Sequence, residues 1–121
     1  MKSFILLLSL LSIVNSAEIK KEFYPNGNIE LEESYENGVK NGPAKSYFES
    51  GKLEAEMNYI NGKRDGITKS YFENGQLESI VTYTKGKQNG LVQSYYENGK
   101  LESEVMFQNG TPIGSTKRYA R

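Results

Sequence analysis

The twelve glycines of this chain recur at a fixed spacing of 24 residues. They form three columns: Gly27, Gly51, Gly75 and Gly99; Gly38, Gly62, Gly86 and Gly110; and Gly42, Gly66, Gly90 and Gly114. Self-similarity at a period of about 20 to 50 residues is the signature of a repeat array in which each unit is one supersecondary motif. The sequence therefore predicts four consecutive units of 24 residues.

The aromatic residues follow the same period. Every aromatic residue beyond residue 16 belongs to one of three columns: Phe23, Tyr47, Tyr71, Tyr95 and Tyr119; Tyr24, Phe48, Phe72 and Tyr96; and Tyr35, Tyr59, Tyr83 and Phe107. An aliphatic column follows the first glycine of each unit: Ile29, Leu53, Leu77 and Leu101. Coincidence does not account for so many columns with one period, so they belong to the repeated unit.

Each unit is expected to contain two turns. Asn74-Gly75 lies between two strand-like runs, and Asn-Gly favours a two-residue type I′ hairpin turn, because both positions need a positive φ. The equivalent pairs are Asn26-Gly27, Ser50-Gly51 and Asn98-Gly99. A second, looser turn is predicted where Gly86 and Gly90 bracket a loop of about four residues.

A two-residue turn at Asn74-Gly75 sets the pairing of the flanking strands. It predicts these opposed pairs: Phe72 with Leu77, Ser70 with Ser79, and Thr68 with Val81. One sheet face should then carry Phe72, Leu77, Val81 and Tyr83, and the other Lys69, Tyr71, Glu78, Ile80 and Thr82. The predicted fold class is all-β, an elongated antiparallel β-meander of about nine strands, with one strand per ~12 residues.

The N-terminal segment reads as a secretory signal peptide. Met1 and Lys2 precede the apolar run 4–14, which is shorter than the ~20 residues that a membrane-spanning helix needs. We expect a signal-peptide helix over residues 1–16, cleavage after Ser16, and an exported product that is periplasmic, on the cell surface or secreted. Residues 17–22 would then form a short linker. The repeat domain would cover 23–121, with units 23–46, 47–70, 71–94 and 95–118 and a C-terminal strand end.

The composition excludes several functional classes. The chain has no Cys and no His, so disulfides, thiolate nucleophiles and the commonest general base and metal ligand are missing. Its 15 basic and 15 acidic residues give a formal charge of zero, whereas nucleic-acid binders need a net basic surface. We therefore predict that the protein is not an enzyme, has no cofactor or metal, and does not bind nucleic acid.

The repeated glutamates are the main argument for a catalytic function. A glycosidase needs two carboxylates about 5 to 10 Å apart, and glutamates recur on the second strand of the units: Glu54, Glu56, Glu78, Glu102 and Glu104. Because they lie beside Lys45, Lys69 and Gln93 of neighbouring strands, solvated cross-strand pairing accounts for them better than catalysis. Asp65, the one aspartate, is explained by turn propensity without a metal.

Two sets of residues are candidates for binding. The aromatic ladder is formed by Tyr47, Tyr71, Tyr95 and Tyr119, because exposed Tyr beside Lys and Glu is typical of recognition surfaces. The alternative is structural, since large side chains shield the backbone of a single-layer sheet from water. The basic edge is formed by Lys63, Arg64, Lys85 and Lys87, which suit anionic lipid or glycan, or serve solubility alone.

The repeated string resembles a known family. Residues 71–77 (YFENGQL) and 83–90 (YTKGKQNG) are similar to the MORN-repeat variant of bacterial YwqK-like proteins, and the resemblance covers residues 23–119. It implies a repeat fold and a non-enzymatic role. Some members are described as antitoxins of toxin modules, and exported arrays of host-associated bacteria have a proposed role in adhesion or invasion.

The favoured functional hypothesis is an exported bacterial protein that offers a protein-binding or scaffolding surface in the envelope or at a host interface. The alternative is a YwqK-like antitoxin or immunity protein that neutralises a toxin. The expected partner is accordingly an envelope, host or toxin protein. Pairing of the open end strands with another chain is a further option.

Overall fold

The computed structural model describes residues 16–121, and every regular element within them is a β-strand. The strands are β1 (Ala17–Phe23), β2 (Ile29–Glu36), β3 (Val39–Tyr47), β4 (Leu53–Ile60), β5 (Lys63–Arg64), β6 (Gly66–Tyr71), β7 (Leu77–Thr84), β8 (Lys87–Gln88), β9 (Gly90–Tyr95), β10 (Leu101–Gln108) and β11 (Thr111–Arg118). The predicted signal peptide lies outside the described residues except for Ser16. In residues 16–121, no helix is long and apolar enough to span a membrane.

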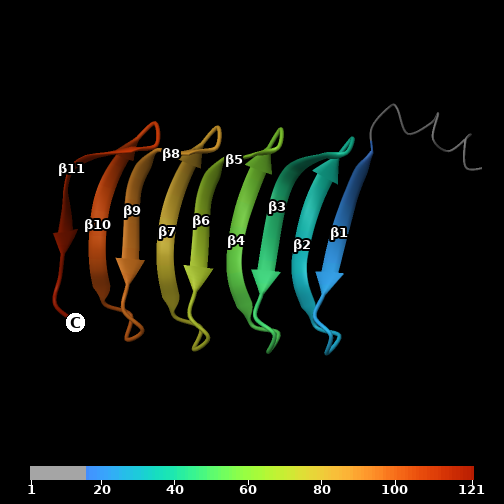
Figure 1. The fold of residues 1–121 in the computed structure, drawn as a ribbon, viewed down its shortest axis with the longest axis horizontal. Coiled ribbons are helices and arrows are strands. Elements are labelled where there is room, and N and C mark those ends of the chain that lie inside the picture. Colours follow the sequence, from blue (N-terminus) through green and yellow to red (C-terminus); the bar gives the residue numbers. More distant parts are fainter. Residues whose placement is uncertain (1–15) are drawn as a thin grey trace, which may run out of the picture.

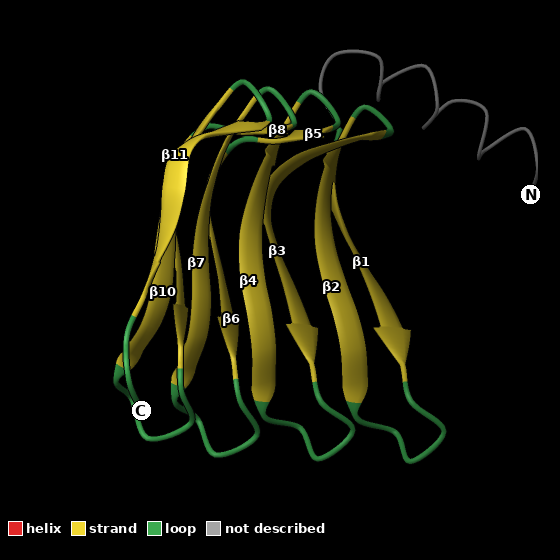
Figure 2. Ribbon diagram, turned by 60° about the vertical axis from the view of Figure 1, so that its left-hand side comes forward, coloured by secondary structure: helices red, strands yellow, loops and turns green. Residues whose placement is uncertain are grey.

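The strands form one sheet that follows the chain. Its order is β1-β2-β3-β4-β6-β7-β9-β10-β11, with antiparallel neighbours throughout, and the short strands β5 and β8 pair with β4 and β7 (Figure 1). Figure 2 shows this ribbon from the side, with one set of turns at each end of the strands. The predicted antiparallel meander of about nine strands is confirmed.

The first turn of each unit differs from the type I′ prediction. The Phe72 N–H donates to the Gln76 carbonyl oxygen at 2.8 Å, which encloses a loop of Glu73, Asn74 and Gly75, and within it the Gly75 N–H donates to the Phe72 carbonyl oxygen at 2.8 Å. Gly75 has a φ of 88°, whereas the φ of Asn74 is not positive. The prediction of two left-handed residues is therefore wrong here, and a three-residue loop ends in one left-handed glycine.

The longer loop changes one strand pair and preserves the others. Tyr71, and not Phe72, lies opposite Leu77, because the register shifts at the end of β6. The pairs Ser70–Ser79 and Thr68–Val81 are confirmed. Asn74 does not supply the predicted positive φ. Its side-chain oxygen instead accepts the N–H of Gln76 at 2.8 Å, which forms an Asx turn.

The type I′ turns occur at the second turn of each unit. Lys85 and Gly86 have φ of 50° and 86°, and Thr84 pairs with Lys87 across them. The equivalent pairs with two positive φ values are Asn37-Gly38, Asn61-Gly62 and Asn109-Gly110. The predicted loop of about four residues is wrong, because the chain re-enters the sheet as β8 directly after the tight turn and bulges later, where Gly90 has a φ of 119°.

Successive turns are hydrogen-bonded to each other at both ends of the sheet. The Lys85 N–H donates to the Asp65 carboxylate at 3.1 Å, and Asn41 and Asn89 accept in the same way from the turns after them. At the opposite end, the Asn74 amide donates to the Glu97 carbonyl oxygen at 3.2 Å. The repeated Asn and Asp residues therefore fix each unit against the next.

The sheet is a single layer without a conventional core. Ala44, which is 2% exposed, is the one buried residue of the described chain. Small hydroxyl side chains face one another across the strands on one side, with Ser70 and Ser79 hydroxyl oxygens 2.6 Å apart. We call this side the serine face, and the opposite side, which carries Lys69 and Tyr71, the ladder face. Cross-strand pairs and the backbone ladder stabilise such a sheet.

Candidate binding face

Three rows of side chains run across the strands of the ladder face. The tyrosine row is Phe23, Tyr47, Tyr71, Tyr95 and Tyr119, near the first turns. The charge row is Lys21, Glu32, Lys45, Glu56, Lys69, Ile80, Gln93, Glu104 and Lys117, in which each residue is the Cα partner of the next. The apolar row is Ile19, Pro43, Ile67, Leu91, Met106 and Ile113, near the second turns.

The tyrosine hydroxyls reach back to the charge row. Tyr71 donates to the Glu56 carboxylate at 2.9 Å, and Tyr119 donates to Glu104 at 2.8 Å. Tyr47 makes the equivalent, longer bond to Glu32 at 3.4 Å. In each case the acceptor lies 15 residues earlier in the chain. Three of the four tyrosines of the predicted ladder are thus hydrogen-bonded to carboxylates.

Tyr95 is the exception in this row. Ile80 occupies the position 15 residues before it, where the other units have glutamate. The Tyr95 hydroxyl donates instead to Gln93 of its own strand at 3.3 Å. Ile80 and Gln93 are Cα partners, so they leave an uncharged gap in the charge row.

The hydroxyl–carboxylate bonds shift the pKa of Tyr71 and of Glu104. Burial first, and then the hydrogen bond to Glu56, raises the pKa of Tyr71 above its ordinary 10.0. The Tyr119 hydroxyl, followed by Gln93, lowers the pKa of Glu104 below its ordinary 4.5. Both shifts favour the protonated tyrosine and the ionised glutamate, which is the state that makes the bond.

Charges alternate along the N-terminal half of the charge row. Lys45 lies between Glu32 and Glu56 across the strands. Within residues 16–121, Lys21 and Glu32 are the one pair of this row close enough for an ion pair, at 3.7 Å. The ammonium groups of Lys45 and Lys69 are therefore not neutralised by direct contact within the described chain.

The apolar row is exposed. Ile19 is 62% exposed and Ile67 53%, and the side chains of Leu91, Met106 and Ile113 are also exposed. Ser34, Asn58 and Thr82 occupy the strands between Ile19, Pro43, Ile67 and Leu91, so the contiguous exposed apolar patch of this row is Leu91, Met106 and Ile113 on β9 to β11.

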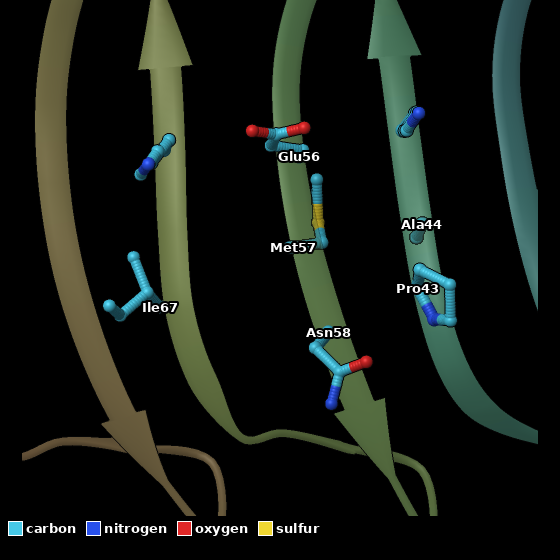
Figure 3. A pocket seen from close by; sticks show the side chains of 8 residues that line it. Pro43, Ala44, Glu56, Met57, Asn58 and Ile67 are labelled. Atoms are coloured by element: carbon cyan, nitrogen blue, oxygen red, sulfur yellow. The ribbon is translucent and has the colours of Figure 1, made fainter.

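Shallow hollows lie between the apolar and charge rows. The first, of about 310 Å³, is lined by Pro43, Ala44, Lys45, Glu56, Met57, Asn58, Ile67 and Lys69. Figure 3 looks into it: Glu56 and Asn58 of β4 lie between Pro43 of β3 and Ile67 of β6. Two further hollows repeat this combination of an apolar wall and charged neighbours, one lined by Ile19, Glu32, Ser34, Pro43 and Lys45, the other including Leu91, Glu104, Met106, Ile113 and Lys117.

The predicted basic edge lies at the second turns. Lys63, Lys85 and Lys87 are exposed there. Arg64 is engaged within the protein: its guanidinium carbon lies 5.3 Å from the centre of the Tyr83 ring, and it donates to the Tyr83 hydroxyl at 3.2 Å. The edge therefore presents lysines, while Arg64 packs on an aromatic ring.

Glu56 and Glu104 accept hydrogen bonds from tyrosine hydroxyls, and Glu102 accepts one from the Ser94 hydroxyl at 3.5 Å. Glu54 and Glu78 lie with Tyr71 in a hollow near the first turns. Residues 16–121 contain no group of three acidic, His or Cys side chains placed to hold a metal ion.

The family comparison agrees with this geometry. The MORN repeat variant family matches the chain four times, at residues 19–37, 40–61, 64–85 and 88–109. The chain belongs to the MORN repeat variant family. MORN repeats are generally modules that bind proteins or membranes. No curated protein matches this MORN array.

Sequence reasoning placed Lys45, Lys69 and Gln93 beside the repeated glutamates but missed the apolar row of this MORN array. The signal of that row is present, because Ile19, Pro43, Ile67 and Leu91 form a further column of period 24. The column mixes residue types, so it is less visible than the glycines. Only the register places it beside the charged residues.

Proposed function

We propose that this MORN-repeat chain is an exported, non-enzymatic protein that uses its ladder face to bind a protein partner, as a scaffold or adhesion- or invasion-associated surface of the bacterial envelope. The observation that carries the proposal is the coincidence of an exposed apolar row and a tyrosine row on one face. Aromatic and aliphatic anchors within a polar surround are the usual anatomy of a protein interface.

The tyrosine row suits this role because hydrogen bonds to carboxylates fix Tyr47, Tyr71 and Tyr119 in advance. A hydroxyl held by a carboxylate loses little conformational entropy when a partner covers the ring. The lysines of the basic edge offer an additional charged contact at the border of the face. The absence of Cys and His from the chain supports a binding role over a catalytic one.

Chemical crosslinking and mass spectrometry in the native envelope test the binding role. The wild-type chain should crosslink to a defined protein, and the double variant Tyr71→Ala, Tyr95→Ala should lose that product. The matched control is Ser70→Ala, Ser94→Ala, which changes the adjacent residues on the serine face. Equal crosslinking by all three chains would contradict the use of the ladder face.

Export has its own test. Cleavage after Ser16 predicts a mature protein that begins at Ala17 and lies outside the cytoplasm. Cell fractionation with N-terminal peptide mapping checks this, and an intact Met1 in the cytoplasmic fraction would contradict it.

The resemblance of residues 71–90 to YwqK-like repeats favours one alternative, an antitoxin or immunity protein. This alternative predicts a toxin gene beside the gene for this chain. Co-expression should then abolish the toxicity, and a neighbourhood without a toxin gene argues against it.

A further inference from the structure

The first turns, at the lower ends of the strands in Figure 1, border a hollow that is separate from those beside the apolar row. It has a volume of about 480 Å³ and includes the first turn of the third unit. Three half-buried aromatic side chains line it: Phe48, Tyr71 and Phe72. The bond from the Tyr71 hydroxyl to Glu56, at 2.9 Å, fixes one of these walls.

Four glutamates complete the lining, so we call this site the acidic hollow. They are Glu54, Glu73, Glu78 and Glu97. Within residues 16–121, no Lys or Arg lines the hollow and none of the four carboxylates forms an ion pair. Lys52 Nζ donates to the Glu73 carbonyl oxygen at 3.2 Å and not to a carboxylate. Carboxylates beside aromatic rings attract a cation, because their charges and the ring quadrupoles act in the same direction.

The same set of residues recurs one unit earlier. The positions 24 residues before the lining of the acidic hollow include these aromatic and acidic residues: Tyr24, Tyr47, Phe48, Glu30, Glu49, Glu54 and Glu73. Burial, and then the charges of these same four glutamates, raise the pKa of Tyr24 above its ordinary 10.0. The four carboxylates therefore act together on one ring, as they do in the acidic hollow.

The fourth unit carries a cation of its own at the equivalent place. Arg121 stands 24 residues after Glu97, where the other units have glutamate. Its guanidinium carbon lies 5.3 Å from the centre of the ring of Tyr96, which is the equivalent of Phe72. Arg121 also shares a hollow with Glu97 and Asn98. A guanidinium therefore fits between the aromatic ring and the glutamate of this repeated site.

Two features favour the arginines of a protein segment over a small free cation. A guanidinium stacks on an aromatic ring and bonds a carboxylate at the same time. In addition, the acidic hollow and its equivalent one unit earlier are two strands apart, about 9.6 Å at ~4.8 Å per strand. A polyproline II segment advances roughly 9.3 Å in three residues and returns to the same side. Arginines at every third position of such a segment reach both sites.

We infer that the acidic hollow and its equivalent one unit earlier bind arginine side chains of an extended segment of the partner protein. The inference rests on the proposed function, since it names the chemistry of the partner proposed there. The exposed lysines Lys63, Lys85 and Lys87 lie at the opposite ends of the strands. The charges of the protein therefore direct a basic segment to the first turns.

Fluorescence anisotropy of a labelled peptide with the full chain tests the inference. The probe has blocked ends and carries two arginines separated by two prolines. It should bind the wild type, and Glu54→Gln with Glu78→Gln should weaken binding at least about tenfold. The control, Glu18→Gln with Glu36→Gln, removes the same charge at the second-turn ends of β1 and β2 and should bind as the wild type does. Circular dichroism confirms that each variant keeps its strands.

Phe48 belongs to both sites, so it tests the aromatic contribution. Phe48→Leu keeps an apolar side chain and removes the ring that faces the cation. Binding of the same probe should weaken about threefold, which corresponds to one lost cation–π contact. An affinity equal to that of the wild type would contradict the role of the ring.

Arg121→Ala tests the role assigned to the fourth unit. A longer probe with three arginines at the same spacing should bind this variant at least about threefold more tightly than the wild type, because the third site then accepts an arginine of the probe. The two-arginine probe should distinguish the two chains by less than about twofold. An unchanged affinity for the longer probe would contradict the equivalence of the three sites.

Several results would overturn the inference. They are a probe that does not bind, equal weakening by the two double variants, and displacement of the probe by an equal concentration of free arginine, which would indicate a site for a small cation. A chain that does not bind the probe and still crosslinks to an envelope protein overturns the inference and leaves the proposed function intact. A chain that binds the probe and crosslinks to no protein does the reverse.

Discussion

The Tyr71 hydroxyl donates a 2.9 Å hydrogen bond to the Glu56 carboxylate, on the strand that precedes it in the sheet. The same relationship joins Tyr47 to Glu32 and Tyr119 to Glu104. Because each bond crosses from one strand to the next, it links neighbouring hairpins of the array. The ladder is therefore a structural element as well as a candidate binding surface.

Tyr71→Phe should destabilise the array. It removes a half-buried hydrogen bond to a carboxylate, and we expect a loss of about 1 kcal/mol in the free energy of unfolding. Urea unfolding followed by circular dichroism measures it. Tyr95→Phe is the matched control and should cost less, because Tyr95 has no carboxylate acceptor. An equal loss in the two variants would contradict the role of Glu56.

Ile80→Glu should complete the ladder. The new carboxylate would lie 15 residues before Tyr95 and would accept its hydroxyl, as Glu56 accepts the Tyr71 hydroxyl. Tyr95→Phe should therefore be more destabilising in this background than in the wild type. A double-mutant cycle should give a coupling of about 0.5 to 1 kcal/mol. Zero coupling would show that the repeat relationship does not transfer to the third unit.

Acid should weaken the Tyr119–Glu104 pair. The pKa of Glu104 is lowered below 4.5 by the Tyr119 hydroxyl in the folded protein. The pair therefore contributes stability above the unfolded pKa, and this contribution disappears as the pH falls through the folded pKa. Glu104→Gln should flatten the dependence of stability on pH below 4.5. Carboxyl-resolved NMR titration checks the direction, and a Glu104 that titrates above its ordinary value would contradict it.

Alkaline pH should destabilise the fold by ionising Tyr71 of the tyrosine row. The pKa of Tyr71 is raised above 10.0 by burial and by Glu56, so its stabilising effect is complete below that pH and is lost as the pH rises through the folded value. Tyrosinate absorbance should show several groups that ionise later in the folded than in the unfolded chain, because the pKa values of Tyr24, Tyr35, Tyr47 and Tyr119 are raised as well. Tyr71→Phe should remove one of these late groups, and an undiminished late amplitude would refute the assignment.

Lys85→Asn should stabilise the second turn of the third unit. Lys85 has a φ of 50°, and the equivalent residue in the other second turns is asparagine, which tolerates the left-handed region better. We expect a gain of a few tenths to about 1 kcal/mol. Thermal unfolding measures it. Lys87→Asn, which leaves the turn conformation unchanged, serves as the control, and an equal effect of both would contradict the backbone explanation.

The period of 24 residues made the sheet predictable. Glycine and aromatic columns determine how many strands form and where they reverse, and the Ser70–Ser79 pair followed from the position of one turn. The turn types were not predictable from Asn-Gly alone. Asn74 and Asn61 both precede glycine, but Asn74 accepts the N–H of Gln76 at 2.8 Å with a φ that is not positive, whereas Asn61 has a φ of 49°.

The hydrogen bonds of the ladder face could not be predicted from the sequence, because they join residues of different strands. Tyr71 could be placed on one face by alternation, but its bond to Glu56 requires the register between β4 and β6. The sequence assigns Arg64 to a basic edge, and only the position of the Tyr83 ring shows that it packs on an aromatic side chain.

Photocrosslinking from two adjacent residues tests the central claim most directly. Ile67 lies on the ladder face and lines its first hollow, whereas Thr68 lies on the serine face opposite Val81. A photoreactive amino acid at position 67 should capture a protein, a second copy or another, in the native envelope, and the same group at position 68 should capture none. Capture from position 68 alone, or from both positions equally, would contradict the assignment of the ladder face as the binding surface.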